Sequence, residues 1–139
     1  MFDTVIDINL KSTIFLTRAV LPKMMSRGHG KIVLVSSVAA RIGGLRASPH
    51  YVAAKGGVSA VVKWLARRGA TAGVNINAVC PGATDTAMTR EQTFNVESIP
   101  LGRMAGAHEI AAPITFLLSE AANYMVGATL DVNGGVYMG

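Results

Sequence analysis

The chain has 139 residues, which is the size of one domain, and half of them are hydrophobic while 15% are charged. An average globular domain is roughly one-quarter charged, so this composition excludes a disordered chain and predicts a soluble protein with a large buried core. No apolar run approaches the roughly 20 residues needed to span a bilayer, Asp3 and Asp7 stand where a signal peptide would be basic, and the single cysteine, Cys80, favours the cytoplasm.

The net charge of +5 is unevenly distributed along the chain. Residues 1–70 carry eleven Lys or Arg and two Asp, whereas residues 71–139 carry two Arg and six acidic residues. A basic half can mark a polyanion-binding protein, but the basic residues here are scattered singly and do not alternate with aromatic residues. We therefore predict solvated faces, with no nucleic-acid partner, no membrane partner and no metal site.

The first half of the chain predicts a helix, a strand and a second helix. Residues 2–26 carry apolar residues near helical spacing, and Pro22 should kink or loosen the last turn. The run K-I-V-L-V-S-S at 31–37 is typical of a strand buried on both faces of a parallel sheet, and a loop rich in Gly and Ala follows it. The second helix begins near Pro49 or Tyr51 and should fray before Gly69; its apolar stripe is Val58, Val61, Val62 and Leu65.

The second half continues the alternation. N-I-N-A-V at 75–79 predicts a buried strand ended by Pro81-Gly82, and residues 84–100 predict a polar loop. A third helix is expected at 107–119 and a third strand at 128–132. The expected core residues of that helix are Ile110, Ile114, Phe116 and Leu117. Helices alternating with strands predict an α/β fold with a parallel sheet.

Ligands of such sheets bind at the carboxyl ends of the strands, and the candidate site residues fall there. They are Ser36 and Ser37 after the first strand, Tyr51 and Lys55 at the start of the following helix, Pro81, Gly82, Thr84 and Thr86 after the second strand, and Asn9 within the first helix, where Asn is locally unfavourable.

Tyr51 and Lys55 are four residues apart and therefore share one helix face. A nearby ammonium favours the phenolate and draws the pKa of a phenol from about 10 toward neutrality, where a general acid or base works best. A serine hydroxyl could hold a carbonyl or alcohol oxygen beside the phenol. Such a site transfers a proton but cannot supply a hydride, so it implies a nicotinamide cofactor.

Each candidate also has a structural explanation. Asn9 could lie at a kink or on the surface, Ser37 could cap a loop, and Pro81-Gly82 could be an ordinary turn. His50, next to Tyr51, is expected to be a loop residue. Cys80 is expected to be a small buried residue, because no His and Asp partners are evident for a nucleophile.

Seven segments in order resemble the C-terminal, catalytic part of the short-chain dehydrogenase/reductase family. They are D-I-N-L-K-S at 7–12, G-K-I-V-L-V-S-S at 30–37, Y-V-A-A-K-G-G at 51–57, N-A-V-C-P-G at 77–82, I-P-L-G-R-M at 99–104, E-I-A at 109–111 and G-A-T-L-D-V-N-G-G at 127–135. The resemblance implies a Rossmann-like three-layer sandwich with a parallel sheet, present here as three strands and three main helices in a single partial domain over 1–139.

The resemblance also assigns roles. Tyr51 is implied as the general acid/base, Lys55 as the residue that lowers its pKa and binds the nicotinamide ribose, and Ser37 as the residue that positions the substrate oxygen. Asn9 is implied to hold a water that links Lys55 to solvent. Thr84 and Thr86 are implied to contact the nicotinamide carboxamide, with Pro81-Gly82 shaping the turn beneath it.

The chain departs from the family pattern at several points. Ser37 and Tyr51 are fourteen positions apart, whereas the corresponding residues of the family are usually thirteen apart. We place the extra residue in a surface loop. Arg68-Gly69 stands where the family has an acid and a large apolar residue, which suggests a shortened helix. The loop from Thr86 to Ile99 is short, which suggests an open pocket. The glycine-rich turn that follows a strand and binds a pyrophosphate is missing, as is the residue that selects NAD or NADP.

The leading hypothesis is an NAD- or NADP-dependent oxidoreductase that interconverts a ketone and a secondary alcohol, resembling 3-oxoacyl-carrier-protein reductases and sugar or polyol dehydrogenases. The alternative is a truncated, non-catalytic remnant that acts only in subunit assembly, and a basic polyanion-binding protein is a third possibility. A homodimer or homotetramer is expected, because the first two helices carry more apolar surface than one sheet face covers, at Leu16, Val20, Val62 and Leu65. The resemblance implies dimer contacts through these helices and tetramer contacts through the last strand. We also expect Met1 to be internal to a longer protein, and the 139-residue chain alone to bind no dinucleotide.

Overall fold

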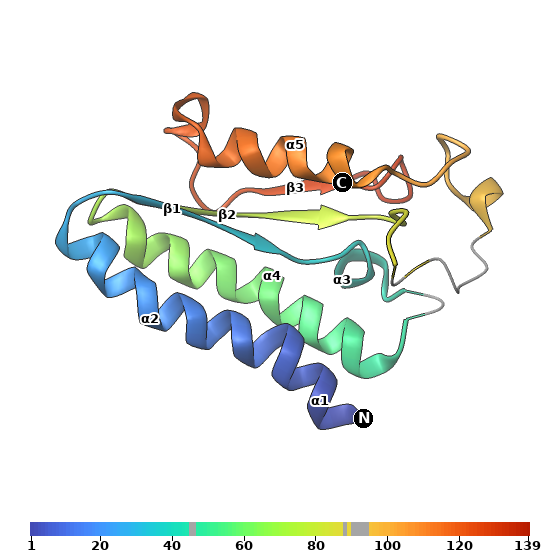
Figure 1. The fold of residues 1–139 in the computed structure, drawn as a ribbon, viewed down its shortest axis with the longest axis horizontal. Helices are drawn as coiled ribbons and strands as arrows, with labels where there is room; N and C mark the ends of the chain where they lie inside the picture. Colours follow the sequence, from blue (N-terminus) through green and yellow to red (C-terminus); the bar gives the residue numbers. More distant parts are fainter. Residues whose placement is uncertain (45–46, 88, 90–94) are drawn as a thin grey trace.

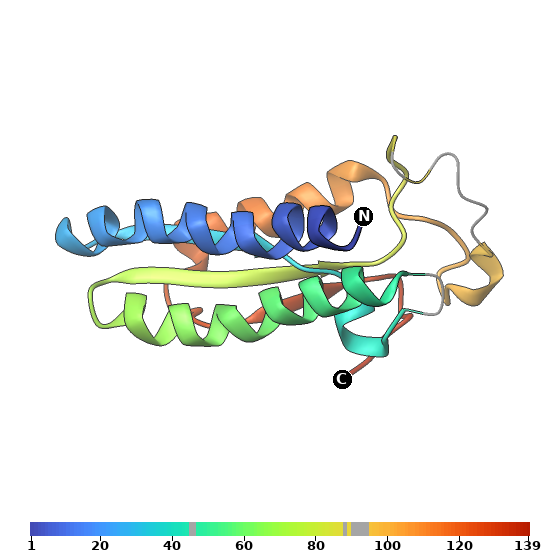
Figure 2. The ribbon, with the colours of Figure 1, turned by 90° about the horizontal axis from the view of Figure 1, so that it is seen from below.

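A computed structural model describes residues 1–44, 47–87, 89 and 95–139 of the chain, arranged in three layers (Figure 1). The middle layer is a parallel sheet in the order β1-β2-β3, formed by Gly30–Val35, Val74–Pro81 and Thr129–Val132. One helix, α5, covers one face, while α2 and α4 lie side by side on the other (Figure 2). The predicted Rossmann-like α/β sandwich with a parallel sheet is confirmed.

The central strand β2 carries the most buried part of the sheet. Val74, Ile76 and Val79 expose 1% or less of their surface, and Cys80 is fully buried, as expected. On the side of α4, Ile76 joins Val58, Val62 and Leu65 in one apolar cluster; on the side of α5, Val79 packs with Leu117 and Ala122. The strand is covered on both faces, which explains its unbroken apolar sequence.

The N-terminal helix is continuous from residue 2 to residue 26, as predicted, but its middle turn is wider than an α-helix. It consists of α1 (Phe2–Ile6), a π-helical turn, η1 (Asp7–Lys11), and α2 (Ser12–Ser26), and it continues through Pro22. The expected apolar stripe of this helix is largely exposed: Ile8, Phe15 and Val20 expose 65%, 54% and 42% of their surface. A π-turn inserts one residue into a helix, so it rotates the residues after it relative to those before it.

Helix α4 (Pro49–Ala70) does not fray before Gly69, so the predicted shortened helix is wrong. Gly69 lies inside the last turn and is buried against β2. A Cβ atom added there would lie 2.9 Å from the carbonyl oxygen of Val74 and 3.2 Å from the Cδ1 atom of Ile76. The glycine therefore lets the helix approach the strand closely and does not mark the end of the helix.

The connecting segments contain short elements that the sequence did not predict. A single turn, α3 (Ala39–Ile42), follows β1 in what was expected to be a loop, and η2 (Val96–Ser98) lies in the expected polar loop. Helix α5 (Ala107–Leu118) has the expected position, and η3 (Glu120–Ala122) follows it. Ile110 and Leu117 are buried, but Phe116 is 42% exposed, so its assignment to the core is wrong.

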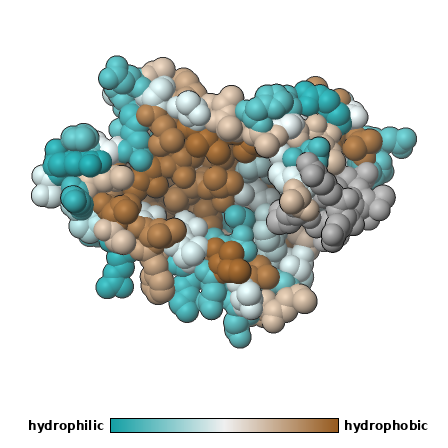
Figure 3. All heavy atoms as spheres, in the orientation of Figure 1, coloured by the Kyte–Doolittle hydropathy of each residue, from teal (hydrophilic) through white to brown (hydrophobic). Residues whose placement is uncertain are grey.

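The strand β1 pairs only with β2 among the described residues and forms one edge of the sheet. Its prediction as a strand buried on both faces is therefore wrong for this chain: Leu34 is buried, but Val35 is 45% exposed. An apolar patch lies over this edge, between α5 and α2 (Figure 3). No helix in the described part of the chain combines the length and the apolar character that crossing a membrane requires.

Candidate active site

The tyrosine and lysine of the predicted pair lie on adjacent turns at the start of α4. Ser48 adopts an extended conformation and Pro49 begins the helix, where the missing N–H of a proline leaves no bond unmade. Tyr51 is in the first turn and Lys55 in the second. The Nζ atom of Lys55 lies 5.8 Å from the centroid of the Tyr51 ring, so the ammonium and the phenol share one face of the helix.

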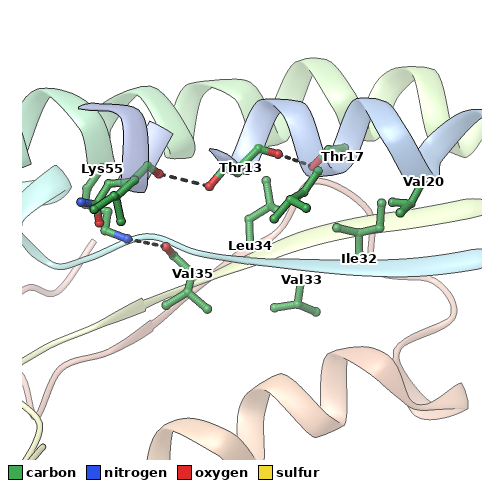
Figure 4. A pocket seen from close by; sticks show the side chains of 11 residues that line it. Thr13, Thr17, Val20, Ile32, Val33, Leu34, Val35 and Lys55 are labelled. Atoms are coloured by element: carbon green, nitrogen blue, oxygen red, sulfur yellow. Dashed lines mark hydrogen bonds between the residues drawn. The ribbon is translucent and has the colours of Figure 1, made fainter. Parts of the chain in front are cut away.

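Lys55 connects this helix to the end of β1. Its Nζ atom donates a hydrogen bond to the carbonyl oxygen of Val35 at 3.0 Å (Figure 4). Burial lowers the pKa of Lys55, because desolvation disfavours the charged amine, and the nearby Cys80 opposes this shift. The ammonium is thus held by the last residue of the strand, at the carboxyl edge of the sheet.

The two serines after β1 make different contacts. Ser36 is buried, and its hydroxyl donates to the carbonyl oxygen of Lys55 at 2.9 Å and lies 2.7 Å from the hydroxyl of Ser59. The hydroxyl of Ser37 accepts a hydrogen bond from the backbone N–H of Ala39 at 3.1 Å. Ser36 therefore ties β1 to α4, while the Ser37 hydroxyl accepts from the first residue of α3 through a lone pair, and that bond does not use its hydroxyl hydrogen.

Asn9 and Lys55 border the same hollow, which has a volume of about 370 Å³ and runs along β1. Asn9 lies in the π-turn, where its side-chain amide donates to the carbonyl oxygen of Val5 at 3.0 Å. The backbone oxygen of Asn9 accepts from the hydroxyl of Thr13 at 3.1 Å. Thr13, Thr17 and Val20 of α2 face Ile32 and Leu34 of β1 across this hollow (Figure 4). Tyr51 and Ser37 are not among the residues that line it.

The segment after β2 is held by backbone contacts on two sides. The N–H of Gly82 donates to the carbonyl oxygen of Val132 at 2.9 Å, and a Cβ atom at Gly82 would lie 2.8 Å from the Cα atom of Asn133. Two further bonds of 2.9 Å join Ala105 to Ala83 and Asp85, so that Thr84 and Ala105 form a parallel bridge. Pro81-Gly82 is therefore not an ordinary turn, because it brings the end of β2 into close contact with the segment after β3.

Thr84 and Thr86 are joined by a residue that the sequence analysis missed, Thr89. Its hydroxyl lies 2.6 Å from the carbonyl oxygen of Thr84 and accepts from the N–H of Thr86 at 2.9 Å. The signal was present in the sequence, because a threonine three residues after another can close a turn with its side chain.

A second missed contact closes the site from the side of β3. Arg41 of α3 donates from Nε and Nη2 to the two carboxylate oxygens of Asp131, at 3.0 and 3.1 Å, and its guanidinium lies 5.5 Å from the centroid of the Tyr137 ring. This donation to the Asp131 carboxylate is the main reason that the pKa of Arg41 is raised. The contact fixes the turn that follows Ser37 against the opposite edge of the sheet.

The site therefore consists of two groups at the carboxyl edge of the sheet. Tyr51, Lys55 and Asn9 gather around the end of β1, and Thr84, Thr86 and Thr89 form a separate turn after β2. Parallel strands end at the same edge, so both groups open on the same side of the fold, which is where ligands bind in open α/β sheets.

The whole chain matches proteins of one enzyme family. The family model described as enoyl-(acyl carrier protein) reductase matches residues 1–137. The chain is 39% identical over 142 residues to the 3-oxoacyl-acyl-carrier-protein reductase FabG of Escherichia coli (strain K12), in an alignment that covers 99% of this chain and 58% of that protein. It is 41% identical to an acetoacetyl-CoA reductase of Allochromatium vinosum, covering 99% of this chain and 57% of that protein.

The fold agrees with this result. A structure from Agrobacterium tumefaciens, described as a candidate 2-deoxy-d-gluconate 3-dehydrogenase with bound NADP, superimposes with a TM-score of 0.91 at 38% identity, covering 97% of this chain and 58% of that one. The chain thus spans a little over half the length of these relatives. Since the family model accounts for nearly every residue and the relatives share both sequence and fold, the chain belongs to the short-chain dehydrogenase/reductase family and is similar to the 3-oxoacyl-acyl-carrier-protein reductases.

Proposed function

We propose that this chain forms the catalytic part of an NAD(P)-dependent oxidoreductase that interconverts a ketone and a secondary alcohol. The observation that carries the proposal is the position of Lys55, whose ammonium lies beside the Tyr51 ring and is anchored on Val35 at the carboxyl edge of the sheet. This arrangement, a phenol and an ammonium on one helix face at the carboxyl edge of the sheet, is the one in which Tyr51 can serve as a general acid or base.

In this proposal Tyr51 donates its phenolic proton to the substrate oxygen during reduction and takes it back during oxidation. Ser37 binds the same oxygen, because accepting from the N–H of Ala39 uses a lone pair of its hydroxyl and leaves the hydroxyl hydrogen for a ligand. Lys55 places its ammonium beside the Tyr51 ring and would also hold the nicotinamide ribose. Asn9 and Lys55 border one hollow, which is the route by which a water held at Asn9 would return a proton to Lys55.

A bound nicotinamide cofactor, NAD or NADP, would supply or accept the hydride. The residues fit the nicotinamide end of such a cofactor: Tyr51 and Lys55 would hold the ribose, and Thr84 and Thr86 the carboxamide. The fit rests on the turn after β2, because that turn is fixed by the bridge between Thr84 and Ala105 and therefore presents its polar atoms without reorganisation. Pro81 and Gly82 would form the base of this site, since Gly82 brings the turn close to Asn133.

We propose a 3-oxoacyl thioester as the substrate. Two relatives with about 40% identity are named as reductases of this class, one for acyl-carrier-protein thioesters and one for acetoacetyl-CoA. Both names describe a ketone two carbons from a thioester carbonyl. A sugar acid is the competing class, because the Agrobacterium structure is described as a dehydrogenase of a deoxygluconate.

The test replaces the phenol in the protein as its gene encodes it. Tyr51→Phe removes only the hydroxyl, so we expect kcat for acetoacetyl-CoA reduction to fall by roughly 10²- to 10⁴-fold while the Kd of the cofactor stays nearly constant. Lys55→Met should lower kcat and raise the Kd of the cofactor. Tyr124→Phe is the matched control, because Tyr124 is fully exposed and distant in sequence from the site. Retention of more than a few per cent of activity in Tyr51→Phe would remove the proton-transfer assignment.

We further propose that the protein is a homo-oligomer that buries the outer face of α1, α2 and α4. Phe15, Leu16 and Trp64 expose 54%, 68% and 60% of their surface on these helices, more large apolar surface than a monomeric helix pair usually presents to water. Val62 and Leu65, which were expected at the contact, are instead buried against the sheet, so their assignment to this surface is wrong. A non-catalytic protein that serves only assembly would use the same surface. Binding of NAD(P)H, measured by calorimetry, separates the two, because only the enzyme requires it.

A further inference from the structure

The hydroxyl of Thr89 lies at the centre of the turn after β2 and is almost completely buried, with 8% of the residue exposed. Four polar atoms surround it. They are the carbonyl oxygen of Thr84 at 2.6 Å, the N–H of Thr86 at 2.9 Å, the carbonyl oxygen of Thr86 at 3.0 Å and the hydroxyl of Thr86 at 3.2 Å. A hydroxyl has one hydrogen to donate and two lone pairs to accept, so these contacts restrict one another.

A carbonyl oxygen can only accept, so the short contacts of the Thr89 hydroxyl with carbonyl oxygens use its single hydrogen. The carbonyl of Thr84 is the nearer of the two, at 2.6 Å against 3.0 Å. One lone pair of Thr89 is used by the N–H of Thr86. The contact at 3.2 Å between the two hydroxyls must then have Thr86 as the donor, because Thr89 has no hydrogen left.

This assignment fixes the polarity that Thr86 presents to a ligand. A free threonine hydroxyl rotates and can donate or accept, whereas this one has committed its hydrogen to Thr89 and offers only lone pairs. The frame around it is held as well, because the bonds between Ala105 and its partners Ala83 and Asp85 pin the strand-like segment on either side of Thr84.

We propose that Thr89 is a positioning residue that turns the hydroxyl of Thr86 into a hydrogen-bond acceptor for the amide NH₂ of a nicotinamide carboxamide; this rests on the proposed function. The carboxamide carries one acceptor, its oxygen, and two donors on its nitrogen. An acceptor at Thr86 pairs with the nitrogen and so selects one of the two orientations of the amide plane. A cofactor without that N–H loses the interaction.

The first experiment requires no cofactor and uses the protein as its gene encodes it. Hydrogen exchange of the Thr86 amide, followed by NMR, should show protection in the wild type and in Thr89→Ser, which keeps the hydroxyl. Thr89→Val has nearly the same shape but no acceptor, so exchange of the Thr86 amide should accelerate at least tenfold. Equal exchange in all three proteins would overturn the positioning role.

The second experiment measures polarity. Calorimetry gives the Kd of NADP, or of NAD if that is the form bound, and of its 3-acetylpyridine analogue, in which a methyl ketone replaces the carboxamide and no N–H remains. The wild type and Thr89→Ser should bind the analogue roughly 2- to 12-fold more weakly, which corresponds to one neutral hydrogen bond. In Thr89→Val the ratio should fall toward one, because the freed hydroxyl of Thr86 can then donate to the ketone.

Thr86→Val keeps the inference testable if Thr89→Val does not fold. It should weaken binding of the natural cofactor and leave the Kd of the analogue unchanged. An analogue that binds the wild type as tightly as the natural cofactor would overturn the proposed polarity while leaving the proposed oxidoreductase standing. If neither NAD nor NADP binds the wild type, the proposed function and the role of Thr86 toward a carboxamide both fail, and the exchange experiment alone then decides the role of Thr89 in the turn.

Discussion

Three glycines of α4 allow the energetic effect of close packing between helix and strand to be measured, because the less crowded glycines serve as controls for the most crowded one. Gly56, Gly57 and Gly69 lie in one 22-residue helix, so replacing each by alanine gives the same gain in helix propensity, about 1 kcal/mol. What differs is the space that the new methyl group meets. A Cβ atom at Gly56 has no atom within 4 Å, one at Gly57 meets the end of the Leu10 side chain at 3.0 Å, and one at Gly69 meets the backbone oxygen of Val74 at 2.9 Å.

The expected order of stability follows from which neighbour can move. Gly56→Ala should raise the free energy of unfolding by about 1 kcal/mol, because nothing opposes the propensity. Gly57→Ala should gain less, since Leu10 must rotate. Gly69→Ala presses on the backbone of β2, which cannot rotate away, and overpacking of this kind costs about 1–3 kcal/mol. It should therefore be about 1–3 kcal/mol less stable than Gly56→Ala.

Urea denaturation followed by circular dichroism, with the fluorescence of the single tryptophan, Trp64, as a second probe, measures the three differences. The difference between the Gly56 and Gly69 variants is the decisive quantity, because the propensity term cancels in it. A Gly69→Ala protein as stable as Gly56→Ala would show that α4 does not approach β2 as closely as the structure has it, and that Gly69 belongs to a frayed end after all.

Two further predictions follow from the site and the surface. Hydrogen bonds from Arg103, and to a smaller extent from the N–H of Gly106, lower the pKa of Glu109 from 4.5 to about 2. The ionised Glu109 therefore stabilises the fold fully above pH 4.5, and this contribution is lost as the pH falls toward 2. Glu109→Gln should make the free energy of unfolding depend less on pH in this range, and an unchanged dependence would contradict the prediction. Static light scattering should give an oligomeric mass that Leu16→Glu lowers, whereas a monomeric mass for the wild type would refute the proposed contact.

The elements with strong periodicity were predicted within about two residues, and the reason is physical. The stripe of Val58, Val62 and Leu65 faces a sheet, and the apolar run of β2 is covered on both faces, so pattern and burial agree. The strand β1 has the same kind of sequence, yet Val35 is exposed, because burial depends on what lies beside a strand and a strand's own residues do not contain that information.

The elements that the sequence did not predict are those fixed by contacts distant in sequence. The turn α3 opens the glycine- and alanine-rich stretch and ends at Gly43, and it is held by the pair between Arg41 and Asp131, which are 90 residues apart. A glycine at position 69 is typical of a helix end, but here it allows α4 to pack closely against Val74 of β2. The π-turn around Asn9 carries no distinct pattern, because one inserted residue in 25 hardly changes an average period.

The candidate site shows the same division. Tyr51 and Lys55 could be paired from spacing alone, since i and i+4 share a helix face, and the structure places the ammonium 5.8 Å from the ring. The hydrogen bonds from Lys55 to Val35 and from the Thr89 hydroxyl to Thr84 could not be predicted, because each joins a side chain to the backbone of a residue outside its own helix or turn pattern. Their assigned roles in catalysis and cofactor binding remain predictions for the experiments above.

The buried thiol of Cys80 can report how often the central strand becomes accessible to solvent. This residue is the only cysteine of the chain, lies fully buried in β2 opposite Asp131 of β3, and has the hydroxyl of Ser59 at 4.0 Å from its sulfur. A thiol reagent can reach it only when the sheet parts from a helical layer or β3 separates from β2. The rate of labelling in native buffer, one label per chain, therefore measures how often the sheet opens, without any engineered probe.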